Sequence, residues 1–334
     1  MGISEFQTKL QDPDGGLTIF RNRPWVLSVI DELGKQVLKG VSRSFYLTLR
    51  LLPAPMRGAA SVGYLLARTS DTLADSAVLT VSDRQGCLDQ FGRCVSGEAD
   101  FHPWQGAVLN TVPDARERRL LECSGSILTW LRSLPEGEAG LVREVLEIII
   151  SGQRLDLERF ANATGENPVA LADDAALEDY AWRVAGCVGA FWTKLGFLTL
   201  GGAFSKSPEA ELVGQGIAYG KALQLVNILR DVAADLAVGR CYLPVADPRD
   251  SSQLLACHAR WLARAEGWLG EGENYAATLR SRRLRAATVL PALLARKTLV
   301  PLHDASWVNL QLPNKIPRSA VYLSLVEAIL KPSA

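Results

Sequence analysis

Two strongly apolar segments of this chain each carry a row of polar side chains at the spacing of one helix face. Residues three and four apart share a face of an α-helix. The remaining faces of both segments are rich in Leu, Val, Ile and Ala. Both helices must therefore be largely buried, and each polar row must face water or an internal polar cavity. The first row is Tyr64, Arg68, Asp71 and Asp75, and the second is Gln224, Asn227, Asp231 and Asp235.

Helical periodicity continues through most of the chain, and no alternating strand pattern competes with it. Pro24 and Pro55 stand where helices begin, and Gly40 and Pro53 where helices end. We find no repeat, and residues 97–113 and 244–252 resemble surface connections. We therefore expect an all-α fold, with one domain over residues 24–334, helices around a central space and a flexible segment over 1–23. The predicted helices cover 24–39, 42–52, 55–75, 82–95, 114–133, 138–163, 174–200, 208–237, 253–280, 282–300 and 318–330.

Composition excludes several classes of function. The 36 basic and 36 acidic residues balance, so no overall field favours nucleic acid. The three histidines are scattered and the six cysteines form no CxxC pair, which argues against zinc and against a Ser-His-Asp triad. A metal would be held mainly by carboxylates, which suits Mg²⁺. The polar N-terminus and the absence of a run as long as a membrane span predict a cytoplasmic protein.

The acids in the two rows suggest a physical role for a cation. Carboxylates four residues apart on a helix repel each other, and burial without partners raises the cost. Mg²⁺ between the rows would remove both penalties, and it commonly binds one or two carboxylates together with phosphate oxygens. Arg68 and Arg230 beside the acids could form forked contacts with a diphosphate. The spacing alone leaves open an ordinary solvated helix face with local salt bridges.

Three segments resemble the squalene/phytoene synthase family. They read SRSF at 42–45, YLLARTSDTLAD at 64–75 and QLVNILRDVAADLAVGRCYLP at 224–244, in the order and at the separations of the family. The resemblance covers nearly the whole chain. It implies a single-domain isoprenoid synthase fold, with helices around a central cavity, that joins two prenyl diphosphates head to head through a cyclopropyl diphosphate.

The resemblance also implies roles for individual residues. Tyr180, in the segment YAWRVAGCVG, matches a catalytic tyrosine, and Tyr64 matches a tyrosine of the cavity. The aspartates of both rows belong to the catalytic set through the metal. The implied metal ligands are Asp71, Asp75, Asn227, Asp231 and Asp235. The implied contacts to the substrate diphosphates are Ser42, Arg43, Ser44, Arg68, Gln224, Asn227 and Arg230.

Other positions keep alternatives open. Ala185, Gly186 and Gly189 either leave room for a prenyl tail or allow close helix packing. Arg240 either contacts a diphosphate, binds a phosphate of the reductant NADPH, or is structural. Ala234 stands where many family members carry an acid, which leaves the number of Mg²⁺ ions open.

A dinucleotide loop is excluded, because no strand precedes the glycines in the expected helix 208–237. Those glycines are Gly214, Gly216 and Gly220.

The leading hypothesis is a squalene-type synthase that uses two farnesyl diphosphates, Mg²⁺ and NADPH. The residue identities in the motifs and in segment 285–299 favour the squalene synthase branch. The alternatives are a phytoene or dehydrosqualene synthase without a reductant and, in a different class, a non-catalytic helical assembly protein, against which the retained acids argue. The expected partners are prenyl diphosphates and no nucleic acid, and a monomer is compatible with the sequence. The amphipathic segment 320–330 could pack, or rest on a membrane surface during product release.

We predict that Asp71→Asn and Asp231→Asn each lower turnover by several orders of magnitude. Each change removes a ligand charge and keeps the size of the side chain, so the helical circular dichroism should not change. Steady-state kinetics with each purified variant checks this. Near-normal activity in either one would contradict a metal site shared by the two rows.

Overall fold

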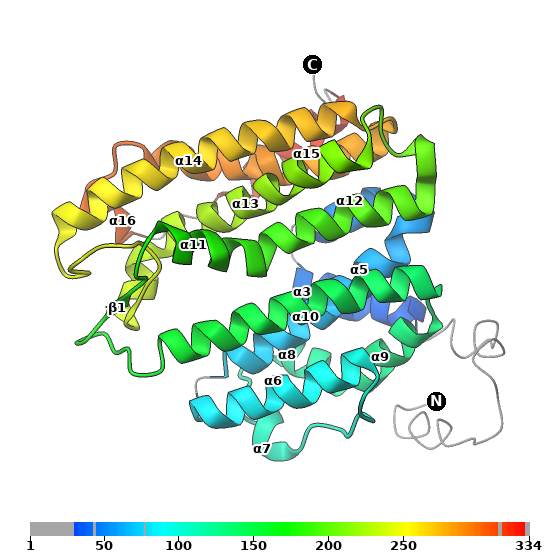
Figure 1. Cartoon of the computed structure of the whole chain (residues 1–334), viewed down its shortest axis with the longest axis horizontal. Coiled ribbons are helices and arrows are strands. Elements are labelled where there is room, and N and C mark those ends of the chain that lie inside the picture. The colour runs from blue at the N-terminus through cyan, green and yellow to red at the C-terminus, as the bar shows by residue number, and fades with distance from the viewer. Residues whose placement is uncertain (1–29, 43–44, 77, 313–315, 331–334) are drawn as a thin grey trace.

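The computed structural model describes residues 30–42, 45–76, 78–312 and 316–330, so the segment 1–23 lies outside the described residues. Long helices run roughly alongside one another through the molecule (Figure 1). Two-residue strands are the only strands in the described ranges, and the predicted all-α fold is confirmed. The first half contains η2 (Leu33–Val37), α3 (Leu38–Ser42), α4 (Phe45–Leu51), α5 (Ala54–Ala74), α6 (Val81–Ser96), α7 (Gly106–Leu109), α8 (Ala115–Glu122), α9 (Ser124–Ser133) and α10 (Glu136–Arg159).

The second half has the longest helices, and α14 and α15 lie on the side of the molecule opposite α6 and α9 (Figure 1). Short 3₁₀ turns, η4 (Gly201–Ala203) and η5 (Val300–Leu302), follow two of them. The elements are β1 (Val169–Ala170), α11 (Asp174–Ala181), η3 (Trp182–Gly186), α12 (Cys187–Leu200), α13 (Glu209–Ala237), β2 (Arg240–Cys241), α14 (Ser251–Thr278), α15 (Arg282–Leu299), α16 (Trp307–Leu310) and α17 (Arg318–Leu330).

Two large groups of buried apolar side chains hold the helices together. The first joins α5, α6, α8, α9, α10 and α12, with Leu65 and Leu146 fully buried in it. The second joins α11, α13, α14 and α15 around residues such as Leu229 and Leu269. The continuous stretch α11–η3–α12 packs against both α10 and α13. The polar row of α5 thus stands on the first group and that of α13 on the second.

The stretch α11–η3–α12 corrects one expectation from the sequence. By length and composition alone, Asp174–Ala203 is apolar enough to cross a membrane. In the fold it runs through the middle of the bundle, and a helix of this kind also occurs in the core of soluble proteins. A π-helical turn at Trp182–Gly186, which begins two residues after Tyr180, interrupts its α-helical pattern. Such turns often accompany functional sites.

Helices α12 and α13 approach each other through glycines. A Cβ atom added to Gly189 would lie 1.8 Å from the carbonyl oxygen of Gly216, and one added to Gly220 would lie 2.2 Å from that of Ala185. At Gly189, therefore, close packing requires glycine. Gly214, Gly216 and Gly220 all lie inside α13. This agrees with the expectation that they belong to a helix and not to a dinucleotide-binding loop.

Several boundaries differ from the prediction. Cys123 divides the expected helix 114–133 into α8 and α9, and Gly40 lies inside α3 and does not end it. The short helix α7 lies in the expected connection 97–113.

The strands β1 and β2 pair in parallel, and sequence patterns missed them because two residues carry no periodicity. Gly239, at φ +91°, turns the chain out of α13, and its carbonyl accepts a 2.9 Å bond from the Val169 N–H. This pairing fixes the backbone position of Arg240 and of Tyr242, which follows the strand.

We predict that Gly189→Ala destabilises the protein by about 1–3 kcal/mol, because the added methyl group must push α12 and α13 apart. Urea unfolding measures the effect. Gly214→Ala is the matched control on α13, where the space is open, and it should stabilise by roughly 0.5–1 kcal/mol through helix propensity. Equal unfolding midpoints for Gly189→Ala and the parent chain would contradict the close approach.

Candidate active site

The first acidic row lies on the last turns of α5. Gln153 on α10 donates a 2.5 Å hydrogen bond to the Asp71 carboxylate, and Arg68 lies 3.8 Å from its other oxygen. Arg68 also forms an ion pair with Glu117 of α8. Asp75 is the exposed residue that caps the helix. Both acids of the row therefore stand at the end of α5 that faces α10.

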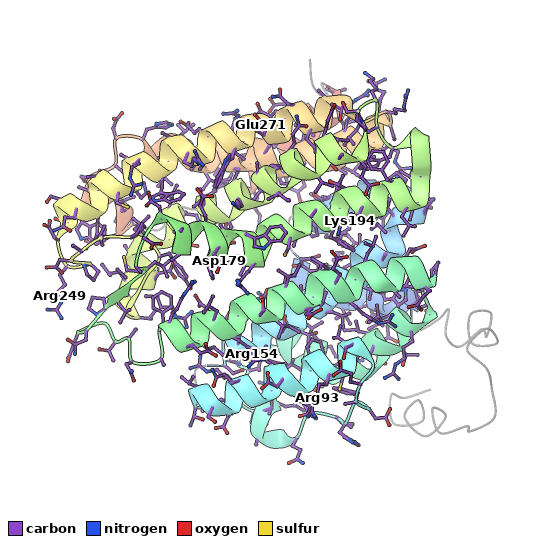
Figure 2. All side chains as sticks on the ribbon, viewed as in Figure 1. Arg93, Arg154, Asp179, Lys194, Arg249 and Glu271 are labelled. Carbon is purple, nitrogen blue, oxygen red and sulfur yellow. The ribbon has the colours of Figure 1, made fainter. Side chains whose placement is uncertain are left out.

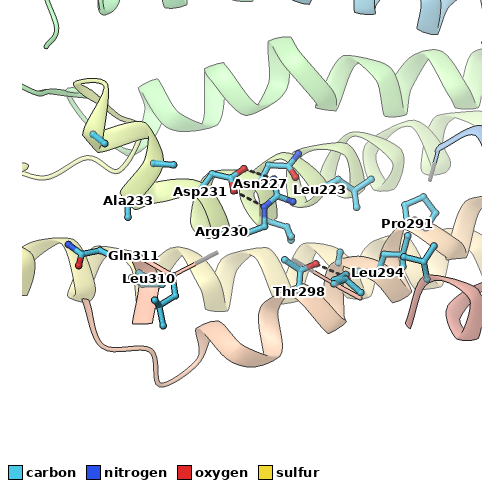
Figure 3. Close-up of a pocket in the computed structure, with 17 residues that line it drawn as sticks. Leu223, Asn227, Arg230, Asp231, Ala233, Pro291, Leu294, Thr298, Leu310 and Gln311 are labelled. Carbon is cyan, nitrogen blue, oxygen red and sulfur yellow. Dashed lines mark hydrogen bonds and ion pairs between the residues drawn. The ribbon is translucent and has the colours of Figure 1, made fainter. Parts of the chain in front are cut away.

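The second acidic row lies on the C-terminal half of α13. The Arg230 guanidinium donates a 2.8 Å hydrogen bond to Asp231 and forms a second bond to its other oxygen. Asn227 is exposed one turn earlier, and Gln224, half-buried, lies one turn before that. Figure 3 shows Asn227, Arg230 and Asp231 along one wall of a cavity, across from Thr298 of α15.

Asp156 and Arg240 connect the two rows. Arg240 lies 4.0 Å from the Asp156 carboxylate, and its positive charge also acts on Asp75 and Asp235. Asp156 in turn acts electrostatically on Asp235. The rows of α5 and α13 thus face a common ionic cluster, which favours the internal cavity over two separate solvated helix faces.

Two tyrosines complete this cluster. The Tyr242 hydroxyl donates a 2.9 Å hydrogen bond to Asp156. The Tyr180 ring stacks on Tyr242, with 4.7 Å between ring centroids. Burial raises the pKa of the Tyr180 hydroxyl well above its ordinary value, so it keeps its proton at neutral pH. The tyrosine that the family resemblance nominated therefore stands beside the acids.

The acids of the site have unusually high pKa values. Desolvation by the neighbouring protein atoms and the charge of Asp75 raise the pKa of Asp71 to about 6, even though 44% of its side chain stays accessible to water. Burial and the charge of Asp231 raise the pKa of Asp235 to about 7. Burial also raises the pKa of Asp156 to about 6, against the opposing hydrogen bond from Tyr242. The cluster lacks enough positive charge, which is the condition that a bound cation would relieve.

Sequence reasoning missed four residues of this arrangement: Glu117, Gln153, Asp156 and Tyr242. Gln153 and Asp156 stand three residues apart on α10, at 7% and 14% exposure, whereas the other buried positions of this helix are apolar or Gly. This polar pair was a signal that could have been found. The Oε1 atom of Gln153 and the Oδ1 atom of Asp156 are buried without a hydrogen-bond partner among the described residues. Both atoms are therefore available to a ligand or an ordered water.

Other predicted site residues lie apart from the cluster or beyond the described ranges. The buried Ser42 hydroxyl bonds to the Leu38 carbonyl of its own helix, and Arg43 and Ser44 lie outside the described residues. The Tyr64 hydroxyl donates a 3.2 Å bond to the Val41 carbonyl, and its ring stacks on Phe45.

Two cavities lie along α13, and the larger one reaches its acidic row at Asp231. A cavity of about 170 Å³ lies between α4, the η3–α12 stretch, α13 and α15, with an almost wholly apolar wall. Ala185 and Gly189 line it, whereas Gly186 does not. A larger cavity of about 1090 Å³ reaches Arg230 and Asp231, and Leu223 and Pro291 line both spaces. Apolar space for a chain-like ligand therefore continues directly from the acidic row of α13.

A family profile described as Squalene/phytoene synthase matches residues 38–320. The chain belongs to the squalene/phytoene synthase family. Members of this family are prenyltransferases, and the resemblance of the motifs is confirmed over most of the chain.

Curated relatives come from two branches of the family. A presqualene diphosphate synthase of Rhodopseudomonas palustris is 31% identical over 60% of this chain and 58% of its own length. One of Zymomonas mobilis is 28% identical over 76% of this chain and 77% of its own. A 15-cis-phytoene synthase of Synechocystis is 31% identical over 65% of this chain and 56% of its own. The matches thus span less than two thirds of the first and third relatives.

Solved structures share the fold. TcSQS in complex with a ligand superposes with a TM-score of 0.72 at 21% identity, covering 92% of this chain and 88% of that one. A dehydrosqualene synthase complex gives 0.62 at 21% identity, covering 91% and 96%. The predicted isoprenoid synthase fold is thereby confirmed.

The donor set of this family member fits Mg²⁺. No three His, Cys, Asp or Glu side chains in the described part of the chain lie close enough to hold a metal by themselves. The oxygen donors lie in pairs on α5 and α13, so an ion would need phosphate oxygens and water in addition. This arrangement agrees with metal binding that depends on a diphosphate, and the assigned ligands stay a prediction.

We predict that the ligand-free protein becomes less stable as pH rises from about 4 to 8, through these acids. Their raised pKa values mean that the folded state binds protons more tightly than the unfolded state, so the free energy of unfolding falls as they ionise. Urea unfolding across this range measures the slope, and Asp235→Asn should reduce it. Mg²⁺ with inorganic pyrophosphate should stabilise at pH 8 more than at pH 5. A slope that Asp235→Asn leaves unchanged would contradict the raised pKa of Asp235.

Proposed function

We propose that this chain condenses two farnesyl diphosphates head to head into presqualene diphosphate in a Mg²⁺-dependent reaction. The observation that carries the proposal is the convergence of the two acidic rows on the Asp156–Arg240 cluster, together with an apolar cavity that continues from the space beside Asp231. The names of the Rhodopseudomonas palustris and Zymomonas mobilis relatives support farnesyl diphosphate as the substrate over a longer one.

The reaction begins when the C–O bond to one diphosphate breaks and leaves an allylic cation. Asp71, Asp75, Asp231 and Asp235, with Asn227, would hold Mg²⁺, which when bound supplies positive charge for the departing diphosphate. Arg68 and Arg230 carry guanidinium groups on the same two rows and can form forked contacts with the phosphate oxygens. In the described structure both are paired with acids, so these pairs would exchange for the substrate.

The second stage joins the cation to the double bond of the other substrate and closes a cyclopropane with loss of one proton. The apolar wall of the smaller cavity keeps water away from the cation. Asp156 is ionised at neutral pH and bonded to Tyr242, so it can receive the proton through the Tyr180–Tyr242 pair. Tyr180, which is protonated at neutral pH, would pass its hydroxyl proton to Tyr242 as it takes up the proton of the substrate, so it is protonated again when the step ends.

Reduction of presqualene diphosphate to squalene with NADPH stays a prediction from the resemblance. Arg240, the residue nominated for NADPH, points into the acidic cluster near Asp156. This position suits a contact to a substrate diphosphate better than a contact to a nucleotide.

Incubation of the purified chain with Mg²⁺ and farnesyl diphosphate, without a reductant, tests the proposal. We expect release of inorganic diphosphate and accumulation of presqualene diphosphate, identified by mass spectrometry. A parallel reaction with NADPH shows whether squalene follows. Rapid formation of phytoene from geranylgeranyl diphosphate, with no product from farnesyl diphosphate, would replace this proposal with the phytoene alternative.

Arg240→Gln separates the two roles of Arg240 in the same assay. If Arg240 contacts the diphosphate, the variant should lose roughly 10²-fold in diphosphate release without NADPH. A nucleotide role predicts a defect only when NADPH is present. Arg93→Gln, on the outer face of α6 (Figure 2), is the matched control and should leave both reactions unchanged.

A further inference from the structure

Gln153 carries the only amide side chain of α10, and its two polar atoms have different surroundings. The residue is 7% exposed. Its Nε2 atom donates a 2.5 Å hydrogen bond to the Oδ1 atom of Asp71. Its Oε1 atom is buried and has no hydrogen-bond partner within the described ranges. A buried acceptor without a partner is unfavourable, so this atom calls for a ligand that can donate to it.

The amide of Gln153 cannot relieve this by turning over. An ionised carboxylate accepts hydrogen bonds and donates none, so an exchange of the two amide atoms would set oxygen against oxygen at Asp71. The helix is held closely as well, because a Cβ atom added to the neighbouring Gly152 would lie 2.8 Å from the Cβ atom of Arg183 in η3. The Oε1 atom of Gln153 therefore stays directed away from Asp71.

A second buried oxygen lies on the same face of α10. Asp156 stands three residues after Gln153, a spacing that leaves roughly 5–6 Å between Cβ atoms. One oxygen of Asp156, Oδ2, accepts the hydrogen bond from Tyr242 and lies 4.0 Å from Arg240. The other oxygen, Oδ1, is buried, and no donor in the described part of the chain reaches it. Two buried acceptors thus occupy neighbouring positions, where one small molecule with two donor hydrogens can meet both.

Water is the small molecule that suits this pair of acceptors. A water that donates both hydrogens to Gln153 and Asp156 directs its lone pairs to the opposite side, where a metal ion can bind them. Mg²⁺ keeps several of its waters when it binds carboxylates and phosphates, and protein groups that hydrogen-bond to its ligands fix their orientation. Direct binding of the metal ion to the two oxygens is disfavoured, because the positive charge of Arg240 lies 4.0 Å from the Asp156 carboxylate.

We propose that Gln153 is a positioning residue for the site that binds Mg²⁺ and diphosphate. Its Nε2 atom holds the Asp71 carboxylate, and its Oε1 atom, together with Oδ1 of Asp156, holds a water that Mg²⁺ binds. The inference rests on the proposed function for the presence of Mg²⁺ and a diphosphate. It adds α10 to a metal site whose predicted ligands all lie on or at the end of α5 and α13.

Isothermal titration calorimetry of the full chain with Mg²⁺ and inorganic pyrophosphate tests the proposal without turnover. Gln153→Met keeps the length of the side chain and removes both polar atoms, so the affinity for Mg²⁺ with pyrophosphate should fall about 10–100-fold. Gln153→Leu is the second variant if Gln153→Met does not fold. Gln85→Met on α6 is the matched control, because the Gln85 amide also donates to a carboxylate, that of Glu158, in an exposed contact of 3.4 Å. This control should bind like the parent chain.

Asp156→Asn in the same titration tests whether one water is shared. The amide oxygen of the variant would accept from the Tyr242 hydroxyl, so its NH₂ group takes the place of Oδ1 and the acceptor is lost. If Gln153 and Asp156 hold the same water, the double variant Gln153→Met/Asp156→Asn should lose less binding free energy than the two single variants lose together. Additive losses would overturn the shared water.

Urea unfolding of the ligand-free proteins separates positioning from a purely structural role. A structural role of Gln153 predicts a lower unfolding midpoint for Gln153→Met and an unchanged affinity for Mg²⁺ with pyrophosphate. That result overturns the inference and leaves the proposed function standing, because the parent chain still binds. If the parent chain itself binds no Mg²⁺ with pyrophosphate, the metal step of the proposed function fails, and the inference about Gln153 fails with it.

Discussion

Repulsion among carboxylates that two apolar cores hold in place is the constraint on which this structure depends. Asp71 and Asp75 are held on α5, which packs into the first core, and Asp235 is held on α13, which packs into the second. Arg240 and Arg68 offset part of the charge, but burial, together with the repulsion that remains, keeps the pKa values of Asp71, Asp156 and Asp235 raised. The fold therefore holds a region of excess negative charge whose free energy falls when a cation and a diphosphate bind.

The two halves of helix α13 have different roles. Its N-terminal half carries Gly216 and Gly220, which let α12 approach closely and shape the wall of the smaller cavity. Its C-terminal half carries Asp231 and Asp235. At 1.5 Å per residue, Gly220 and Asp231 are roughly 16 Å apart along the axis. A single rigid helix thus sets the apolar space and the polar site at a fixed separation.

The arrangement around Arg240 shows how a small irregular element can decide the chemistry of a site. Gly239 ends α13 in a left-handed conformation, and the parallel pair β1–β2 then holds the next residues. As a result Arg240 and Tyr242 face Asp156 of α10, which is far away in the sequence. Without this turn Arg240, whose positive charge acts on both Asp75 and Asp235, would not be placed to act on the two rows together.

Local periodicity was enough to predict the helices, the all-α fold and the faces that carry Asp71, Asp75, Asp231 and Asp235, because spacing along a helix determines which side chains share a face. The residue identities in the three motifs were enough to predict the family. Sequence could not show that Asp156, Gln153 and Tyr242 join the site, since their contacts link α10 to residues 82 to 86 positions away. Nor could it choose between tail space and close packing at Gly189, which serves both once α12 and α13 cross. It also could not tell that the face of α17 with Ser324 and Ala328 is the buried one, because the larger apolar side chains lie on the exposed face. Those outcomes depend on which surfaces meet when the two cores assemble, and only the tertiary structure decides that.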